Sequence, residues 1–206
     1  MTVYYYKGAK ILAPFSIISN EPMYDVDTVS LGKQRASQNA QRWEMSFTTV
    51  GEPSTQVDML LGAVTNTDSA QSMIMPQLPS VDASFTVDAT TVALANSASA
   101  GATSVVLNTT DVDGFLPKGS FVSFSGLSGS DKVYLVMNDV NLDAVANPTV
   151  QLYPQLKVQI GASNTMKMGS AVLFKYYTDI SNLSGITFTD GVLSNAGTIT
   201  LIEALS

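Results

Sequence analysis

The sequence predicts a mostly β protein in which a β domain with one helix is interrupted by a small inserted β-barrel. Three observations predict it: Thr, Ser, Val and Gly are abundant, most apolar runs are short, and turn residues bound these runs. The chain has 206 residues, which is enough to bury one large core or two small ones. We therefore expect two packed β units.

The clearest predicted strand spans residues 41–49. Apolar residues alternate along it with polar ones, which are Arg42, Glu44, Ser46 and Thr48. Because successive strand side chains point to opposite faces, Trp43, Met45 and Phe47 should be buried and the polar set should face water. After a break at 52–54, apolar residues recur at helical spacing over 57–64, the one helix that the sequence predicts.

In the middle of the chain the long alternating patterns give way to a proline-containing segment and then to short apolar runs. Residues 65–80 are expected to form an extended loop or an edge strand, because Pro76 and Pro79 cannot donate hydrogen bonds to a central strand. From about Ser84 a series of short strands follows, at 85–92, 104–108, 120–125, 132–138, 148–153 and 171–177. Five or six short strands of this kind can close as a small barrel.

The last part of the chain returns to longer alternation. Residues 185–190 alternate, Asp190 and Gly191 mark a turn, and residues 198–205 alternate again. That last pattern breaks at Glu203, which falls on the apolar face. The simplest organisation has residues 1–84 and 178–206 forming one discontinuous β domain, with residues 85–177 inserted as the barrel.

The composition argues against most kinds of catalytic and metal-binding site. The chain has no histidine and no cysteine, so it lacks the commonest general base, the commonest zinc ligand and the thiol nucleophile. Asp139, Asn141 and Asp143 have the spacing of half a calcium loop, but Ala144 and Val150 stand where that loop needs Gly and Glu. We therefore expect no enzyme activity, no catalytic residue, no metal and no cofactor.

Charge and hydropathy narrow the possible partners. Seventeen acidic residues oppose 10 basic ones, for a net charge of −7, so sequence-specific binding to nucleic acid is not expected. No apolar stretch is long enough for a membrane span, and the N-terminal apolar block is too short for a signal peptide. The protein is expected to stay in the compartment where it is made. Only 13% of residues are charged, against about 25% on average, which is consistent with a subunit that hides surface against copies or partners and equally with a large core under a Ser/Thr-rich surface.

Two groups of residues are candidates for an interface. The polar set Arg42, Glu44, Ser46 and Thr48 would lie at a channel lumen or at a seam between subunits. The cluster Tyr4, Tyr5 and Tyr6 could anchor a neighbouring subunit, since tyrosine is favoured at interfaces. A strand with one tyrosine buried is an equally good interpretation of this cluster.

Several segments follow one another in a characteristic order. They begin with the strand 40–47 and the segment after Pro53. They continue in the insertion through 116–124, Lys132 to Val136, 150–156 and 171–175, and end in the turn at 190–191 and the strand 198–205. This order resembles the distal tail protein (Dit) family of long-tailed bacteriophages, of the type with an inserted barrel.

The resemblance implies a structural virion protein at the phage tail tip, made in the cytoplasm of the host bacterium. It would form a ring, six-fold in this family, with a tail-tube-like β-sandwich or barrel domain and an OB-like inserted barrel. The ring would join the tail tube to the baseplate hub and the tail fibres, and DNA would pass through its channel. The alternatives are another baseplate or tail-tube component, and a glycan-binding or glycan-degrading module of the tail.

Overall fold

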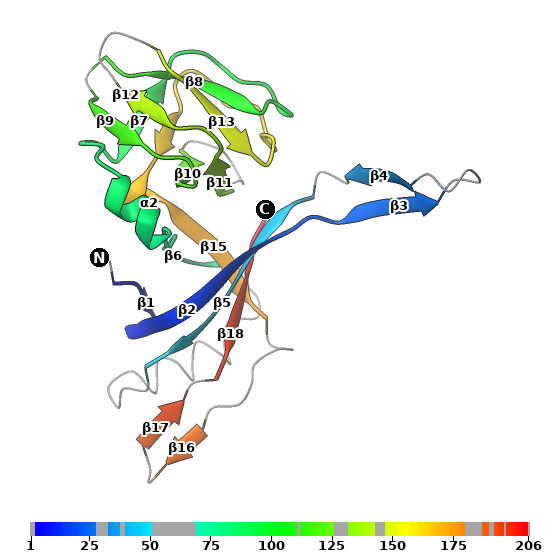
Figure 1. Ribbon diagram of the computed structural model, residues 1–206, viewed down its shortest axis with the longest axis vertical. Coiled ribbons are helices and arrows are strands. Elements are labelled where there is room, and N and C mark those ends of the chain that lie inside the picture. Colours follow the sequence, from blue (N-terminus) through cyan, green and yellow to red (C-terminus); the bar gives the residue numbers. More distant parts are fainter. Residues whose placement is uncertain are drawn as a thin grey trace.

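The protein is mostly β, as predicted, and its strands form a six-stranded sheet, a closed six-stranded barrel and three two-stranded sheets (Figure 1). The structure is a computed structural model that describes residues 3–27, 33–37, 40–50, 69–110, 112–125, 132–142, 147–179, 187–189, 192–195 and 197–205. No helix in these ranges is long and apolar enough to cross a membrane.

The six-stranded sheet is antiparallel throughout and draws its strands from both ends of the chain. In spatial order these are β1 (Tyr5–Tyr6), β2 (Ala9–Asn20), β5 (Arg42–Thr49), β18 (Ile199–Glu203), β15 (Leu173–Thr178) and β6 (Gln71–Ile74). A two-residue turn joins β1 to β2, and both of its residues, Lys7 and Gly8, have the positive φ that such a tight hairpin requires (48° and 81°). β18 lies at the centre of the sheet, between β5 and β15.

The barrel lies at one end of the molecule (Figure 1). Its strands, in order around the barrel, are β10 (Phe121–Phe124), β11 (Tyr134–Val136), β13 (Thr149–Tyr153), β8 (Ser104–Asn108), β7 (Thr91–Leu94) and β14 (Thr165–Lys167). Its apolar core includes the fully buried side chains Leu107, Tyr134, Leu156, Ile160 and Met166.

Smaller elements surround these two bodies. The hairpins β3 (Met23–Asp27)–β4 (Lys33–Ser37) and β16 (Thr187–Thr189)–β17 (Val192–Asn195) project away from the sheet (Figure 1). β9 (Gly114–Leu116) pairs with β12 (Val140–Leu142) beside the barrel. Gly114 has φ 136°, and a Cβ there would lie 2.6 Å from the Thr86 carbonyl oxygen, so no other residue fits. Within the part of the chain that the structure describes, the helices are α2 (Pro79–Ser84) and the 3₁₀ turn η2 (Gly169–Ala171).

Several predicted elements need correction. The strand predicted at 171–177 is present as β15, but it pairs with β18 and β6 and so belongs to the sheet, not to the barrel. The strand predicted at 85–92 begins only at Thr91, because residues 85–90 are irregular and bond to Phe115 in β9 and to Asp113 just before it. β14 and α2 were not predicted, since a short polar strand and a one-turn helix carry little periodicity. The edge strand expected within 65–80 is β6, whereas the helix at 57–64, the turn at 190–191 and Asp143 lie outside the described residues.

Trp43 joins the sheet to the barrel. Its ring makes edge-on contacts with Phe121 on β10 and Tyr153 on β13, with centroid distances of 5.4 and 6.2 Å. Its indole Nε1 donates a hydrogen bond of 2.8 Å to the carbonyl oxygen of Val133, just before β11. Phe121 and Val133 are part of the buried core that packs against one face of the six-stranded sheet, here called the inner face. One side of the barrel therefore covers part of that face.

Replacing Trp43 tests this junction. We expect Trp43→Ala to lower the free energy of unfolding by about 3–5 kcal/mol, because it removes a buried aromatic side chain and leaves the Val133 carbonyl without its donor. Trp43→Phe keeps most of the apolar area and should cost less. Denaturant unfolding followed by circular dichroism measures both, and equal stability of the two variants would contradict this role for the indole.

Candidate functional surface

The predicted polar residues of β5 share one face of the six-stranded sheet, here called the outer face. Along β5, Trp43, Met45 and Phe47 are buried, Arg42 is exposed, and Glu44, Ser46 and Thr48 are partly exposed. The alternation therefore follows the sequence pattern. Ser46 lies opposite Ser16 of β2 and Thr200 of β18, and its Oγ is 3.0 Å from the Thr200 Oγ1.

Apolar side chains occupy the same face. In one row across the sheet, Ile18 on β2 lies opposite Glu44, Glu44 opposite Ile202, and Ile202 opposite Tyr177 on β15. Ile18 is 52% exposed and Tyr177 is 43% exposed. By the same registers, the face carries three further exposed apolar side chains, which are Leu12, Ile74 and Leu173. A sheet face with this many exposed apolar groups is typical of an interaction surface.

The three adjacent tyrosines do not act as one group. Tyr5 is 58% exposed and pairs with Lys10 on the outer face, whereas Tyr6 is 2% exposed and packs between Phe47 and Tyr176 in the core. Tyr4 is half-buried, and its hydroxyl accepts a 2.9 Å hydrogen bond from the Gln77 backbone N–H. Only Tyr5 is therefore placed to meet a partner together with the polar residues of β5.

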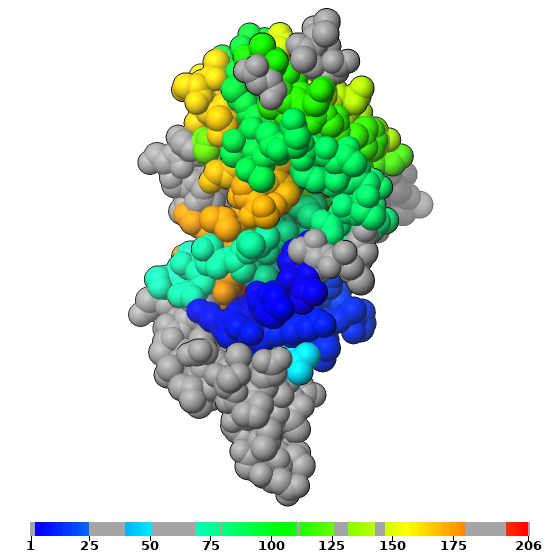
Figure 2. Space-filling view, turned by 90° about the vertical axis from the view of Figure 1, so that its left-hand side faces the viewer, coloured from blue at the N-terminus to red at the C-terminus, as the bar shows by residue number. Residues whose placement is uncertain are grey.

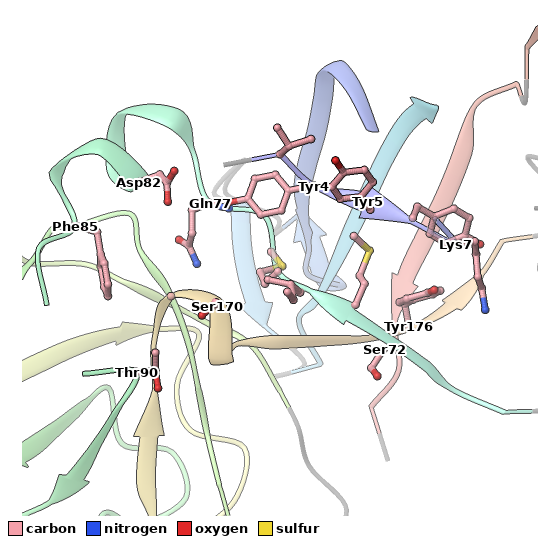
Figure 3. Close-up of a pocket in the computed structure, with 16 residues that line it drawn as sticks. Tyr4, Tyr5, Lys7, Ser72, Gln77, Asp82, Phe85, Thr90, Ser170 and Tyr176 are labelled. Atoms are coloured by element: carbon pink, nitrogen blue, oxygen red, sulfur yellow. The ribbon is translucent and has the colours of Figure 1, made fainter. Parts of the chain in front are cut away.

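A cavity of about 440 Å³ lies where the two edge strands of the sheet, β1 and β6, approach one another (Figure 3). In the space-filling view the N-terminal residues lie against the segment that contains β6 (Figure 2). Two side-chain bonds span the gap: Tyr4 to Gln77, and the Lys7 Nζ to the Gln71 Oε1. Met73, Met75 and Tyr176 line the cavity between them. The sheet is thus curled, and its edges are held together by side chains instead of backbone pairing.

A buried ion pair lies on the inner face of the sheet, away from this cavity, where the sheet meets the barrel. The Lys132 Nζ is 2.9 Å from the Glu203 Oε2, and the two side chains are 3% and 0% exposed. Lys132 also donates to the backbone and side-chain oxygens of Gln41, at 2.9 and 2.7 Å. Glu203 accepts hydrogen bonds from the backbone N–H groups of Trp43 and Val133, at 3.0 and 2.8 Å. All three Lys132 protons and both Glu203 oxygens are therefore engaged.

Burial is the larger effect on the Lys132 ammonium and lowers its pKa, while the negative charge of Glu203 opposes that shift. A charge pair out of water is tolerated only where every donor and acceptor finds a partner, which is the case here. The pair therefore makes the sheet–barrel contact specific, because any other docking of the barrel would leave a buried charge alone.

Sequence reasoning identified part of this arrangement. Glu203 was visible as a break in the apolar pattern of its strand, but nothing in the sequence pointed to Lys132 as its partner. The exposed apolar residues of the outer face were also missed, because each belongs to a different strand and only the register brings them together.

Removing one member of the ion pair should be costly. We expect Glu203→Leu to lower the free energy of unfolding by about 3–5 kcal/mol, since it leaves the Lys132 ammonium buried without a counter-charge. The double variant Lys132→Met with Glu203→Leu should recover part of that loss. Denaturant titration of both variants tests this, and a double variant less stable than Glu203→Leu would contradict it.

The tyrosines around the cavity make stability sensitive to alkali. Burial is the main cause that raises the pKa of Tyr6 and of Tyr176 above the ordinary value of 10.0. A raised pKa means that the folded state holds the proton more tightly, so the stabilisation is complete below pH 10 and is lost as pH rises further. The phenolate absorbance of Tyr6 and Tyr176 should therefore appear together with unfolding. Tyr176→Phe should make the loss of stability with pH less steep, and phenolate formation by Tyr176 in the folded protein near pH 10 would contradict this.

Comparison with known proteins does not assign the chain to a family. No protein-family model matches it, and no curated protein matches it. Its function must therefore be inferred from the geometry of its surfaces and from the order of motifs in its sequence.

Proposed function

We propose that this chain is a structural subunit of a long-tailed bacteriophage: a distal tail protein that assembles into a six-membered ring at the end of the tail tube. The ring joins the tube to the baseplate hub and the fibres. The observation that carries the proposal is the outer face of the sheet, where Leu12, Ile18, Ile74, Leu173 and Tyr177 are all exposed. The motif order described above supplies the tail setting.

The outer face suits contact with a second copy of the chain. A ring needs a head-to-tail interface, in which one surface of each subunit binds a different surface of the next. The face combines apolar side chains with the uncharged hydroxyl groups of Ser16 and Ser46. Lys10 is a charged residue of the same face, so assembly would bring charges as well as apolar groups into the contact. Arg42 and Glu44 lie on this face and would set its orientation or line the channel.

The charge of the chain suits passage of DNA. Lysine and arginine along a channel would bind phosphates and hold the duplex. Each subunit instead carries a net charge of −7, so a ring would repel DNA from its wall. No catalytic function is part of the proposal, and the partners are the tube, hub and fibre proteins.

The assembly state of the purified protein tests this proposal. We expect light scattering and negative-stain images to show closed rings. Ile18→Glu should weaken assembly by about tenfold or more, since it places a carboxylate in a desolvated contact. Met137→Glu is the matched control, because Met137 is also 52% exposed but lies on the barrel, and its rings should persist. A monomeric wild-type protein, or rings that survive Ile18→Glu unchanged, would overturn the proposed interface.

A further inference from the structure

Three buried side chains with complementary reactivity meet at the sheet–barrel junction. They are an amine on Lys132, a carboxamide on Gln41 and a carboxylate on Glu203, with exposed fractions of 4%, 2% and 2% for the three residues. The Lys132 Nζ is 2.7 Å from the Gln41 Oε1 and 2.9 Å from the Glu203 Oε2. The amine thus donates hydrogen bonds both to the oxygen of a carboxamide whose carbon it could attack and to a base that could take its proton.

The surroundings hold these groups in place. Backbone N–H groups of Trp43 and Val133 fix the Glu203 carboxylate from two sides. The Gln41 backbone oxygen accepts a second bond from the Lys132 Nζ, at 2.9 Å, which fixes the amine over the same residue. Reacting groups held in one geometry in a dry site react far faster than free groups in water. A desolvated lysine amine next to a base is an activated nucleophile.

We propose that Lys132 and Gln41 join in an intramolecular isopeptide bond, formed by the protein itself with Glu203 as the general base and acid. Glu203 takes a proton from the Lys132 ammonium, and the freed electron pair of Nζ forms a bond to the Gln41 Cδ. The bond from Cδ to Nε2 then breaks, and Nε2 leaves as ammonia after receiving a proton back through Glu203. Glu203 then takes the second proton that Nζ loses and ends as a neutral carboxylic acid, so protons and charge balance and no oxidant or co-reactant is needed.

The leaving group has a polar route out of the site. The Gln41 Nε2 donates to the Ser19 Oγ at 3.0 Å, and that hydroxyl lies 3.0 Å from the Tyr153 hydroxyl. Tyr153 in turn donates to the Glu21 Oε2 at 3.0 Å. A second cavity, of about 320 Å³, is lined by Gln41, Lys132, Tyr153 and Glu21. Ammonia released from Gln41 therefore enters a cavity with hydrogen-bonding walls.

The bond would fasten the barrel to the sheet covalently, and the ion pair described above would be the arrangement that positions the barrel before the bond forms. Gln41 immediately precedes β5, Lys132 lies two residues before β11, and 91 positions of the sequence separate them. This inference is independent of the proposed function, because it rests only on the three side chains and their partners.

Mass spectrometry of the full-length protein tests the bond. The folded protein is kept in neutral buffer until its mass no longer changes. We expect that mass to be lower than the sequence mass by one ammonia molecule. Trypsin should then fail to cut after Lys132, and peptide 36–42 should be recovered joined to peptide 119–157. A folded protein with the full sequence mass, and with peptides 36–42, 119–132 and 133–157 recovered separately, would overturn the proposal.

Three variants separate this chemistry from other losses of mass. Gln41→Glu should lose water instead of ammonia, because the leaving group changes from nitrogen to oxygen. Glu203→Gln should keep the sequence mass while circular dichroism shows that it is folded. Gln77→Glu is the matched control: Gln77 is also buried, but its amide bonds to the Phe121 backbone, so this variant should still lose ammonia. Unchanged ammonia loss in Gln41→Glu would contradict the assignment to Gln41.

Discussion

The desolvated contact between Lys132 and Glu203 is the constraint on which the relation of the two bodies depends. Apolar surface alone would let the barrel slide over the sheet, because burial of apolar area is not directional. The ion pair removes that freedom, since each charge is tolerated only where the other meets it. Trp43 adds to this constraint, because its ring packs on the barrel while its backbone N–H bonds to Glu203. One short segment of β5 therefore contributes both packing and polar specificity to the junction.

The two faces of the sheet differ in what covers them. The inner face is buried within the chain. Its side chains, Tyr6 and Tyr176 among them, pack on one another and on the barrel, and the ion pair lies where the two meet. The outer face has a mixed character, with isoleucine, leucine and tyrosine side chains among serine and threonine. Such a mixture is compatible both with contact with water and with burial against a second protein surface, as the proposed ring would require. This is what a subunit needs if it is to fold first and assemble later.

Features that depend on residues close together in the sequence could be predicted from it, whereas features that depend on distant residues could not. The alternation along β5 is local, so the sequence predicted its buried and exposed residues. The strand 171–177 was predicted as a strand, but its sheet was not, because partner choice depends on residues that are distant in the chain. Glu203 was recognisable as an anomaly, whereas Lys132 gave no signal. Lysine between short strands is ordinary in a sequence, and only the tertiary fold buries it.

The central position of β18 has a consequence for the order of folding. β5 and β15 do not pair with one another, and β18, later in the sequence than either, fills the space between them. The same strand carries Glu203. During synthesis the barrel strands, from Thr91 to Lys167, are complete while this space is still empty. Placement of this one late strand unites the two halves of the sheet and brings the counter-charge to Lys132 in a single event.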